Sequence, residues 1–363
     1  MSFRTLARKL HLYAGLAAAP FLLLLGATGA FLEFEYPIDR LLNLRLSHVM
    51  PEPERVPLQL LLQRVRQVYP DYRIQSLDLS PYSTSPEIAF FFQAQDPQGR
   101  PATIYVDQYR GTVLGLRRGE GFAARVHDFH TDLLLGERGE AVMMTVAVLL
   151  VLLGASGLVL WWPRKLLGVE WGGSGLRLNF SLHNTLGLVC SGSLLLFGLS
   201  GFVIYWQDSW LLPATNRMLH ISDRETAPRI AALPGQVLQD LDQLDAAACA
   251  ALPGARSTRI VLPAGNDAAK VWMKFPDDHT ALGRSAVLID PYSGLVLRSR
   301  SSRTAPLPAR YFRQWNREIH TGDLLGWPTR LLAFAAALLL PGLAVTGPLL
   351  WWMRRRRRQT LPV

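Results

Sequence analysis

The sequence predicts an α-helical membrane protein that has four transmembrane helices, a tandem duplication and two periplasmic α+β domains. Hydrophobic residues make up 49% of the 363 residues and charged residues only 18%, a balance shifted toward membrane proteins. Four apolar stretches of about 20 residues or more reach the length that crosses a hydrocarbon core roughly 30 Å thick. Motifs in the first half of the chain also return, in the same order, in the second half.

The four stretches are residues 10–32, 141–162, 182–205 and 331–352. The first has features of a cleaved signal peptide, because basic residues precede it and the small residues 27–30 offer a cleavage site. It is longer, however, than the apolar core of most signal peptides, and the third stretch repeats its pattern. We therefore expect a retained transmembrane helix.

Clusters of Lys and Arg predict the orientation, because such clusters beside helix ends mark the cytoplasmic side. They precede the first stretch (Arg4, Arg8, Lys9), follow the second (Arg164, Lys165) and follow the fourth (354–358). Both termini are thus predicted to be cytoplasmic, and the two long segments face the periplasm or the exterior. The net charge of +10 largely reflects these clusters, so it indicates a lipid bilayer as partner and no nucleic acid.

The repeated motifs flank the apolar stretches. His11 and Gly15, followed by Thr28-Gly29, return 172 residues later as His183, Gly187 and Ser200-Gly201. "FHTDLLLG" (129–136) returns 190 residues later as "IHTGDLLG" (319–326). Between these motifs, "VDQYRGTVLG" (106–115) matches "IDPYSGLVLR" (289–298). Each half is therefore predicted to run helix, outer domain, helix.

This organisation divides the chain into eight segments. They are transmembrane helix 1 (1–35), outer domain 1 (36–128), a juxtamembrane histidine segment with helix 2 (129–162), a cytoplasmic loop (163–180), helix 3 (181–206), outer domain 2 (207–318), a second histidine segment with helix 4 (319–353), and a basic cytoplasmic tail (354–363).

Each outer segment has the pattern of one helix laid on a small antiparallel sheet. Helices are predicted at 58–69 and 234–252. Strands are predicted at 73–80, 87–95, 102–107 and 111–116, and again at 259–264, 270–275, 286–290 and 294–299. The motif Asp107-x-Tyr109-x-Gly111 predicts a hairpin turn in which the Asp binds local backbone and the Gly takes a positive φ.

Four histidines occupy equivalent positions in the two halves. His11 and His183 are predicted at the cytoplasmic edge of the membrane, and His130 and His320 at the outer edge. Because the membrane thickness separates the two levels, each histidine pairs only within its own level. Two imidazoles that face each other across a pseudo-two-fold axis suit the axial positions of a haem iron, so we predict all four as haem ligands. Gly15 and Gly187, one turn away, leave room for a flat macrocycle.

Ordinary surface histidines and a zinc site are the competing interpretations. The symmetric pairing disfavours the first, and the lack of nearby Cys or carboxylate ligands disfavours the second. His127 is an alternative ligand, because it lies three residues before His130 on a predicted helix, although Arg317 takes its place in the second half. Arg317 is a candidate contact for a haem propionate or an anionic substrate. No residue is assigned a catalytic role.

The chain resembles the PepSY-associated transmembrane family, also known as iron-regulated membrane proteins. The matching features are "KLHLYAGL" (9–16), the twice-used Asp-x-Tyr-x-Gly-x-Val-Leu pattern, the two histidine motifs, and the helix ends "LVLWWPRK" (158–165) and "LLWWMRRR" (349–356). They extend over nearly the whole chain, which looks most like the inner-membrane ferrisiderophore reductases. The resemblance implies PepSY-like outer domains and haem b, and we expect one haem at each level, with ligands at His11, His183, His130 and His320.

The resemblance also implies an activity, that of a haem-dependent oxidoreductase. The expected reaction passes electrons across the membrane from a quinol or a reductase to a ferric siderophore in the periplasm, which releases Fe(II) for iron uptake. The sequence has no Gly-x-Gly-x-x-Gly after a strand and no Walker A motif, which fits a chain that receives its electrons from a partner. The alternative is a non-catalytic PepSY-type sensor or regulator that binds a peptide or a protease. A siderophore transporter is less favoured, because the predicted spans carry almost no charge.

Overall fold

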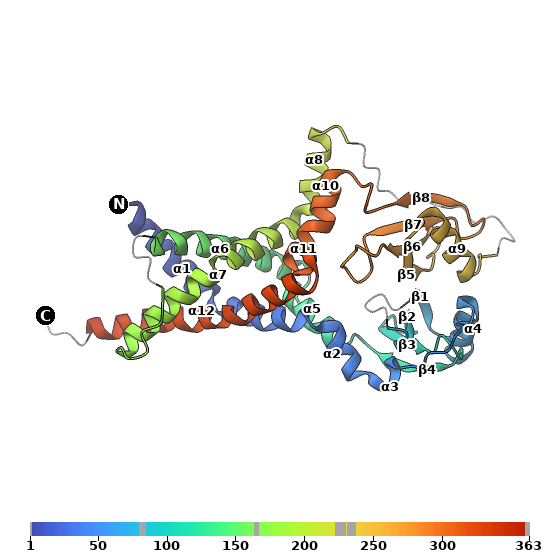
Figure 1. Ribbon diagram of the computed structural model, residues 1–363, viewed down its shortest axis with the longest axis horizontal. Helices are drawn as coiled ribbons and strands as arrows, with labels where there is room; N and C mark the ends of the chain where they lie inside the picture. Colours follow the sequence, from blue (N-terminus) through green and yellow to red (C-terminus); the bar gives the residue numbers. More distant parts are fainter. Residues whose placement is uncertain (1, 80–84, 163–166, 222–229, 231–236, 360–363) are drawn as a thin grey trace. The chain divides into compact units, whose positions relative to one another are not determined.

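The computed structural model describes residues 2–79, 85–162, 167–221, 230 and 237–359, which form two compact units (Figure 1). The helical unit comprises residues 1–35, 124–215 and 311–363, and the sheet unit comprises residues 36–123 and 216–310. Arg164 and Lys165 of the predicted cytoplasmic loop, and the first residues of the helix predicted at 234–252, lie outside the described residues.

Four long helices dominate the helical unit. They are α1 (Phe3–Leu32), α6 (Glu137–Trp161), α7 (Gly175–Trp206) and α12 (Trp327–Gln359). Each is long and apolar enough to cross a membrane, which confirms the four predicted transmembrane helices. The helix that begins with α7 continues through a π-helical turn, η1 (Gln207–Leu211), into α8 (Leu212–Met218).

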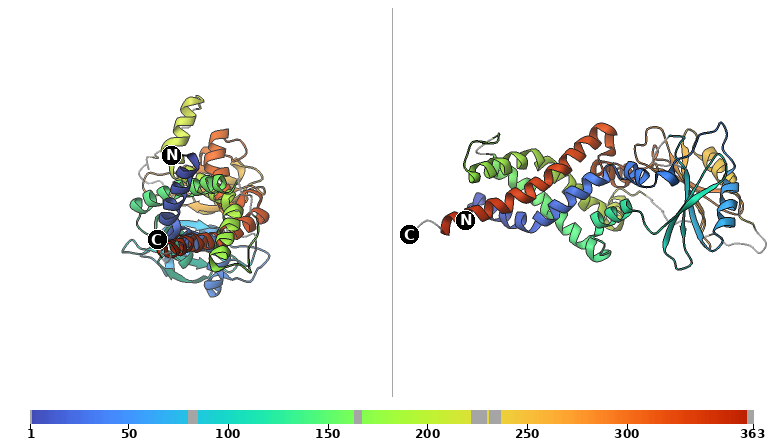
Figure 2. Two further views of the ribbon diagram at one scale, coloured as in Figure 1. Left: turned by 90° about the vertical axis from the view of Figure 1, so that its left-hand side faces the viewer. Right: turned by 90° about the horizontal axis from the view of Figure 1, so that it is seen from below.

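The four long helices form a ring in which α1 packs on α6 and α12, and α7 packs on the same two helices (Figure 2). The apolar core between them includes Ala18, Leu22, Leu150, Leu153, Leu194 and Leu343. Glycines let the backbones approach closely, as is common in membrane helices. A Cβ on Gly26 of α1 would lie 2.6 Å from Pro341 Cδ of α12, and one on Gly198 of α7 would lie 2.8 Å from the Ala147 carbonyl oxygen of α6. In this ring α1 and α7 stand on a diagonal.

Short helices complete the helical unit next to the long ones. The chain enters α6 through α5 (Phe122–Asp132), and it enters α12 through the turns η2 (Tyr311–Trp315), α11 (Asn316–His320) and η3 (Asp323–Leu325). Helix α11 packs against α7. The histidines of the two "HT" motifs, His130 and His320, therefore lie on short helices of the helical unit.

One antiparallel sheet of eight strands, in the order β4-β3-β2-β1-β5-β6-β7-β8, forms the centre of the sheet unit. The strands are β1 (Arg73–Asp78), β2 (Phe90–Gln95), β3 (Pro101–Val106), β4 (Val113–Arg118), β5 (Arg256–Val261), β6 (Ala269–Lys274), β7 (Ser285–Ile289) and β8 (Val296–Arg300). All eight lie where the sequence predicted strands. The sheet unit also includes the short helices α2 (Glu35–Leu42), α3 (Leu44–Ser47) and α10 (Leu307–Arg310).

The two outer segments share this sheet, whereas the sequence suggested a separate sheet for each. Strands β1 and β5 join them, with Leu77 opposite Ile260 and Asp78 opposite Arg259. The pairing removes two sheet edges whose backbone groups would otherwise be unpaired. Two helices, α4 (Leu58–Val68) and α9 (Leu241–Ala251), cover the sheet and share one apolar core with it.

A buried ion pair fixes the register of the β1–β5 junction. The Arg259 Nε donates to Asp78 Oδ1 over 2.6 Å, and the Asp78 side chain has no exposed surface. Burial raises the pKa of the Asp78 carboxyl to about 6, and the Arg259 charge opposes that shift. The predicted hairpin turn is also confirmed: Asp107 Oδ1 accepts hydrogen bonds from the Tyr109 and Arg110 amides, and Gly111 has a φ of +67°.

Candidate functional site: two pairs of histidines

The four histidines singled out by the repeats come together as two pairs in the helical unit. His11 of α1 and His183 of α7 face each other across the diagonal of the ring, with ring centroids 6.3 Å apart and ring planes at 74°. His130 of α5 and His320 of α11 are the second pair: His130 contacts Thr28 of α1, His320 contacts Ser200 of α7, and the charge of His320 lowers the pKa of His130.

The pairs lie at two levels of the helical unit. On α1, His11 belongs to the first pair and Thr28, 17 residues later, contacts the second pair. At 1.5 Å per residue, this separation corresponds to about 26 Å along the helix axis. His183 and Ser200 of α7 show the same spacing. Pairing therefore occurs within each level.

A hydroxyl group holds the Nδ1 atom of every one of these imidazoles. The partner always lies on one of the four long helices, and the distances are 2.9 Å for His11 with Ser156, 2.7 Å for His130 with Thr28, 3.0 Å for His183 with Thr346 and 2.8 Å for His320 with Ser200.

The position of the hydroxyl proton determines which imidazole nitrogen is protonated. Each hydroxyl donates to the carbonyl oxygen four residues earlier in its own helix: Thr28 to Leu24 over 2.8 Å, Ser156 to Leu152 over 2.5 Å, Ser200 to Leu196 over 2.6 Å and Thr346 to Gly342 over 2.6 Å. A hydroxyl has one proton to donate, so its oxygen must accept from Nδ1–H. The proton is therefore on Nδ1, and every Nε2 carries a free lone pair, the form in which imidazole binds a metal.

A glycine follows each of these hydroxyl residues and lies against the imidazole. A Cβ on Gly29, Gly157, Gly201 or Gly347 would lie 3.3 to 3.5 Å from the Cε1 atom of His130, His11, His320 or His183 respectively. Gly15 and Gly187, which the sequence favoured as space for a macrocycle, face Leu153 and Leu343 instead. The glycines that give the imidazoles room are thus those of the Ser/Thr-Gly dipeptides.

Two buried asparagines support the sites, and the sequence analysis missed them. The Asn179 side chain donates to the Thr346 carbonyl oxygen over 3.0 Å, and the Asn316 side chain donates to the Ser200 carbonyl oxygen over 3.0 Å. Each asparagine lies one helical turn before a paired histidine and binds the residue that holds that histidine. The signal was the spacing Asn-x-x-x-His, which occurs before His183 and before His320 and has no counterpart in the first half.

Burial keeps the outer pair neutral. It lowers the pKa of His130 to about 3, with a further contribution from the charge of His320. It also lowers the pKa of His320 to about 4, and the nearby Arg317 charge adds to that shift. The Arg317 charge therefore lies near His320. His127 is half-exposed and lies 3.7 Å from Asp128, so the structure does not place it in either pair.

The spacing of the inner pair fits two ligands of one iron. A metal–imidazole bond is about 2.0 Å long and the ring centre lies about 1.1 Å behind the nitrogen, so two axial imidazoles have centroids roughly 6 Å apart. The observed separation is 6.3 Å. Within residues 2–79, 85–162, 167–221, 230 and 237–359, no group of three or more His, Cys, Asp or Glu side chains is arranged to hold a metal ion.

Comparison with known proteins places the whole arrangement in one family. No curated protein gives a significant match to the chain. The family model described as the PepSY-associated TM region matches residues 8–354, which include all four long helices and both histidine pairs. On the strength of that match, the chain belongs to the PepSY-associated transmembrane family.

Proposed function

We propose that the protein is a haem-containing reductase of a bacterial inner membrane that delivers electrons to ferric siderophores in the periplasm. The observation that carries the proposal is the contact of a hydroxyl group with the Nδ1 atom of every paired imidazole, because it orients each imidazole and leaves its Nε2 atom available to bind a metal. Haem b, when bound, supplies one-electron chemistry, while the protein supplies its ligands and surroundings.

The histidines have different roles at the two levels. His11 and His183 would hold the haem nearer the cytoplasm, which receives electrons from a quinol or a reductase. His130 and His320 would hold the outer haem, within reach of a ferric chelate. Reduction to Fe(II) weakens the bonds of the metal to hard oxygen ligands, so the siderophore releases its iron without being degraded.

The charge pattern and the internal repeat support this topology. Arginines 354–358 lie at the same end of the ring as His11 and His183, and such clusters mark the cytoplasmic side. In the sheet unit, α4 and α9 begin and end 183 positions apart, and so do β1 and β5. A tandem duplication accounts for this constant offset and for the two symmetric pairs of histidines. The sheet unit would then be periplasmic.

The spectrum of the purified protein tests the proposal. We expect a red protein whose Soret band shifts on reduction with dithionite, and whose reduced form is reoxidised by a ferric siderophore under anaerobic conditions. A colourless preparation from haem-sufficient cells would contradict the proposal. If that preparation bound peptides or a protease, it would favour the sensor function instead.

Substitution of Gly201 tests whether the glycines make room for the ligands. A Gly201→Leu variant is expected to lose most of the haem of the outer level, because its side chain would push His320 away from its position. The matched control is Gly192→Leu on the same helix, since a Cβ at Gly192 meets nothing within 4 Å. Haem content per protein is measured by the pyridine haemochrome assay. Equal haem content in the two variants would show that Gly201 is not part of the site.

A further inference from the structure

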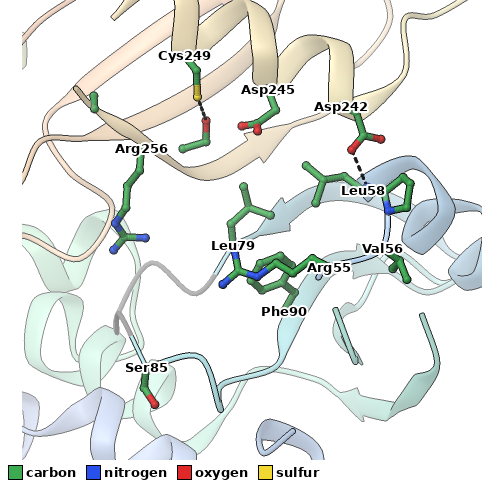
Figure 3. Close-up of a pocket in the computed structure, with 13 residues that line it drawn as sticks. Arg55, Val56, Leu58, Leu79, Ser85, Phe90, Asp242, Asp245, Cys249 and Arg256 are labelled. Atoms are coloured by element: carbon green, nitrogen blue, oxygen red, sulfur yellow. Dashed lines mark hydrogen bonds between the residues drawn. The ribbon is translucent and has the colours of Figure 1, made fainter. Parts of the chain in front are cut away.

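The sheet unit contains a cavity of about 710 Å³ that is separate from the histidine pairs (Figure 3). Its walls come from the segment before α4, from α9 and from the strands near the β1–β5 junction. Ligand sites for small organic molecules have volumes of about 300–1,000 Å³. The cavity is therefore large enough for such a molecule.

Two guanidinium groups, those of Arg55 and Arg256, reach into the cavity (Figure 3). The Arg55 guanidinium lies 5.1 Å from the centroid of Phe90 and 5.9 Å from that of Tyr109, and these rings hold it in position. Burial and the positive charge of Arg55 both lower the pKa of Arg256. In the part of the chain that the structure describes, no ion pair joins either arginine to a carboxylate. Among the described residues, the two positive charges thus lie near each other and neither is paired with a carboxylate.

The carboxylates on the opposite wall already have other roles. Asp242 accepts from the Leu58 amide over 2.8 Å and from the Gln59 amide over 3.0 Å, so it caps the first turn of α4. Burial raises the pKa of Asp245, and a hydrogen bond from Ser257 opposes that shift. Because Asp242 occupies the amides of α4, recognition of an anion in the cavity falls to the two arginines.

The second half of the sheet unit provides an internal comparison. A smaller cavity of about 380 Å³ is lined by Arg66, Tyr72, Arg73 and Leu238, among others. At the offset of 183 positions, Leu238 corresponds to Arg55, Arg73 to Arg256, Tyr72 to Ala255 and Arg66 to Cys249. The two cavities thus differ in volume and in the position of their arginines: Arg66 and Arg73 line the smaller one, and Arg55 and Arg256 line the larger one.

We propose that the larger cavity binds an organic dianion whose carboxylates are held by Arg55 and Arg256 and whose apolar body packs against Leu58, Leu79 and Phe90. Guanidinium groups match carboxylates in a bidentate geometry, and a dianion neutralises both charges at once. The apolar side chains cover the part of the ligand between its charged groups. The site does not depend on haem, so the binding experiment can succeed or fail independently of the proposed reductase activity.

Calorimetry on the full chain in detergent tests the site, with naphthalenedicarboxylate as the probe. We expect Arg55→Gln and Arg256→Gln each to weaken binding about tenfold or more, since a hydrogen bond to a charged group contributes about 1.5–3 kcal/mol. Arg73→Gln is the matched control and should bind as the parent does. The neutral naphthalenedimethanol and inorganic phosphate separate charge recognition from apolar burial and from binding of any oxyanion.

Three outcomes would overturn the proposal. One is equal affinity of the parent, Arg55→Gln and Arg256→Gln proteins for the dicarboxylate. Another is binding of the neutral diol as tightly as the dicarboxylate. The third is no arginine-dependent binding at dicarboxylate concentrations up to about 1 mM, the weakest affinity that such a site would be expected to show. Haem content and melting temperature, measured on the same samples, show whether the variants are folded.

Discussion

A His320→Ala variant is expected to retain about half of the parent's haem and to lose most of its ferric-siderophore reduction. On the proposed function, the substitution would remove one of the two imidazoles that hold the outer haem, and His130 alone would hold it weakly. The His11–His183 pair, about 26 Å away along the helix axis, should keep its haem. Since loss of groups that merely orient a metal ligand already costs about 10–100-fold, the rate of chelate reduction should fall roughly tenfold or more.

The control for this experiment is His127→Ala, because His127 lies on the same helix as His130 but is half-exposed and outside the pair. It should keep full haem content and an unchanged rate. Added imidazole provides a second control, since it can occupy the space left in His320→Ala and restore part of the Soret absorbance. Full haem content together with an unchanged rate in His320→Ala would exclude His320 as a ligand.

An Arg259→Leu variant is expected to destabilise the sheet unit by about 3–5 kcal/mol, because it leaves the carboxylate of Asp78 buried without its partner. Denaturant unfolding followed by circular dichroism measures the change. Arg303→Leu is the matched control. Arg303 also pairs with a carboxylate, that of Asp277, but the two side chains are 52% and 63% exposed. Loss of an exposed pair should cost no more than about 1 kcal/mol.

The pH dependence of the difference in unfolding free energy between Arg259→Leu and the parent separates the effect of a buried charge from that of lost packing. In the parent the pKa of Asp78 is about 6, and without Arg259 only the hydrogen bond from Ser76 opposes the effect of burial, so the pKa rises further. A carboxyl whose pKa is higher in the folded chain than in the unfolded chain makes the protein most stable at low pH, and that stability is lost as the pH rises through the folded pKa. The difference in unfolding free energy between the variant and the parent should therefore increase from about pH 6 to about pH 8. If that difference did not change with pH, the loss of stability would come from lost packing instead.

The sequence was sufficient to predict the elements that depend on local patterns. Long apolar runs gave the four membrane helices, and alternating residues gave the eight strands to within a few positions. The β1–β5 junction was not predictable in this way, because it pairs residues about 180 positions apart. Its register depends on the contact of Asp78 with Arg259, and neither residue is distinctive in its own segment.

The candidate site was predictable only where the two halves repeat each other. The repeats identified all four histidines together with the Thr28-Gly29 and Ser200-Gly201 dipeptides. Ser156 and Thr346 were overlooked, since hydroxyl groups on apolar helices often bond only to their own backbone. Asn179 and Asn316 were missed for a different reason. They lack counterparts in the first half, and a comparison of repeats passes over such residues.

The hydroxyl groups also bear on how the sites would meet the proposed cofactor. Each one is bound to its own helix backbone, so the membrane helices orient the imidazoles without any bound iron. Much of the entropy cost of arranging the ligands would then be met during folding rather than during cofactor insertion. On the proposed function, the helical unit would act as a preorganised receptor for the cofactor.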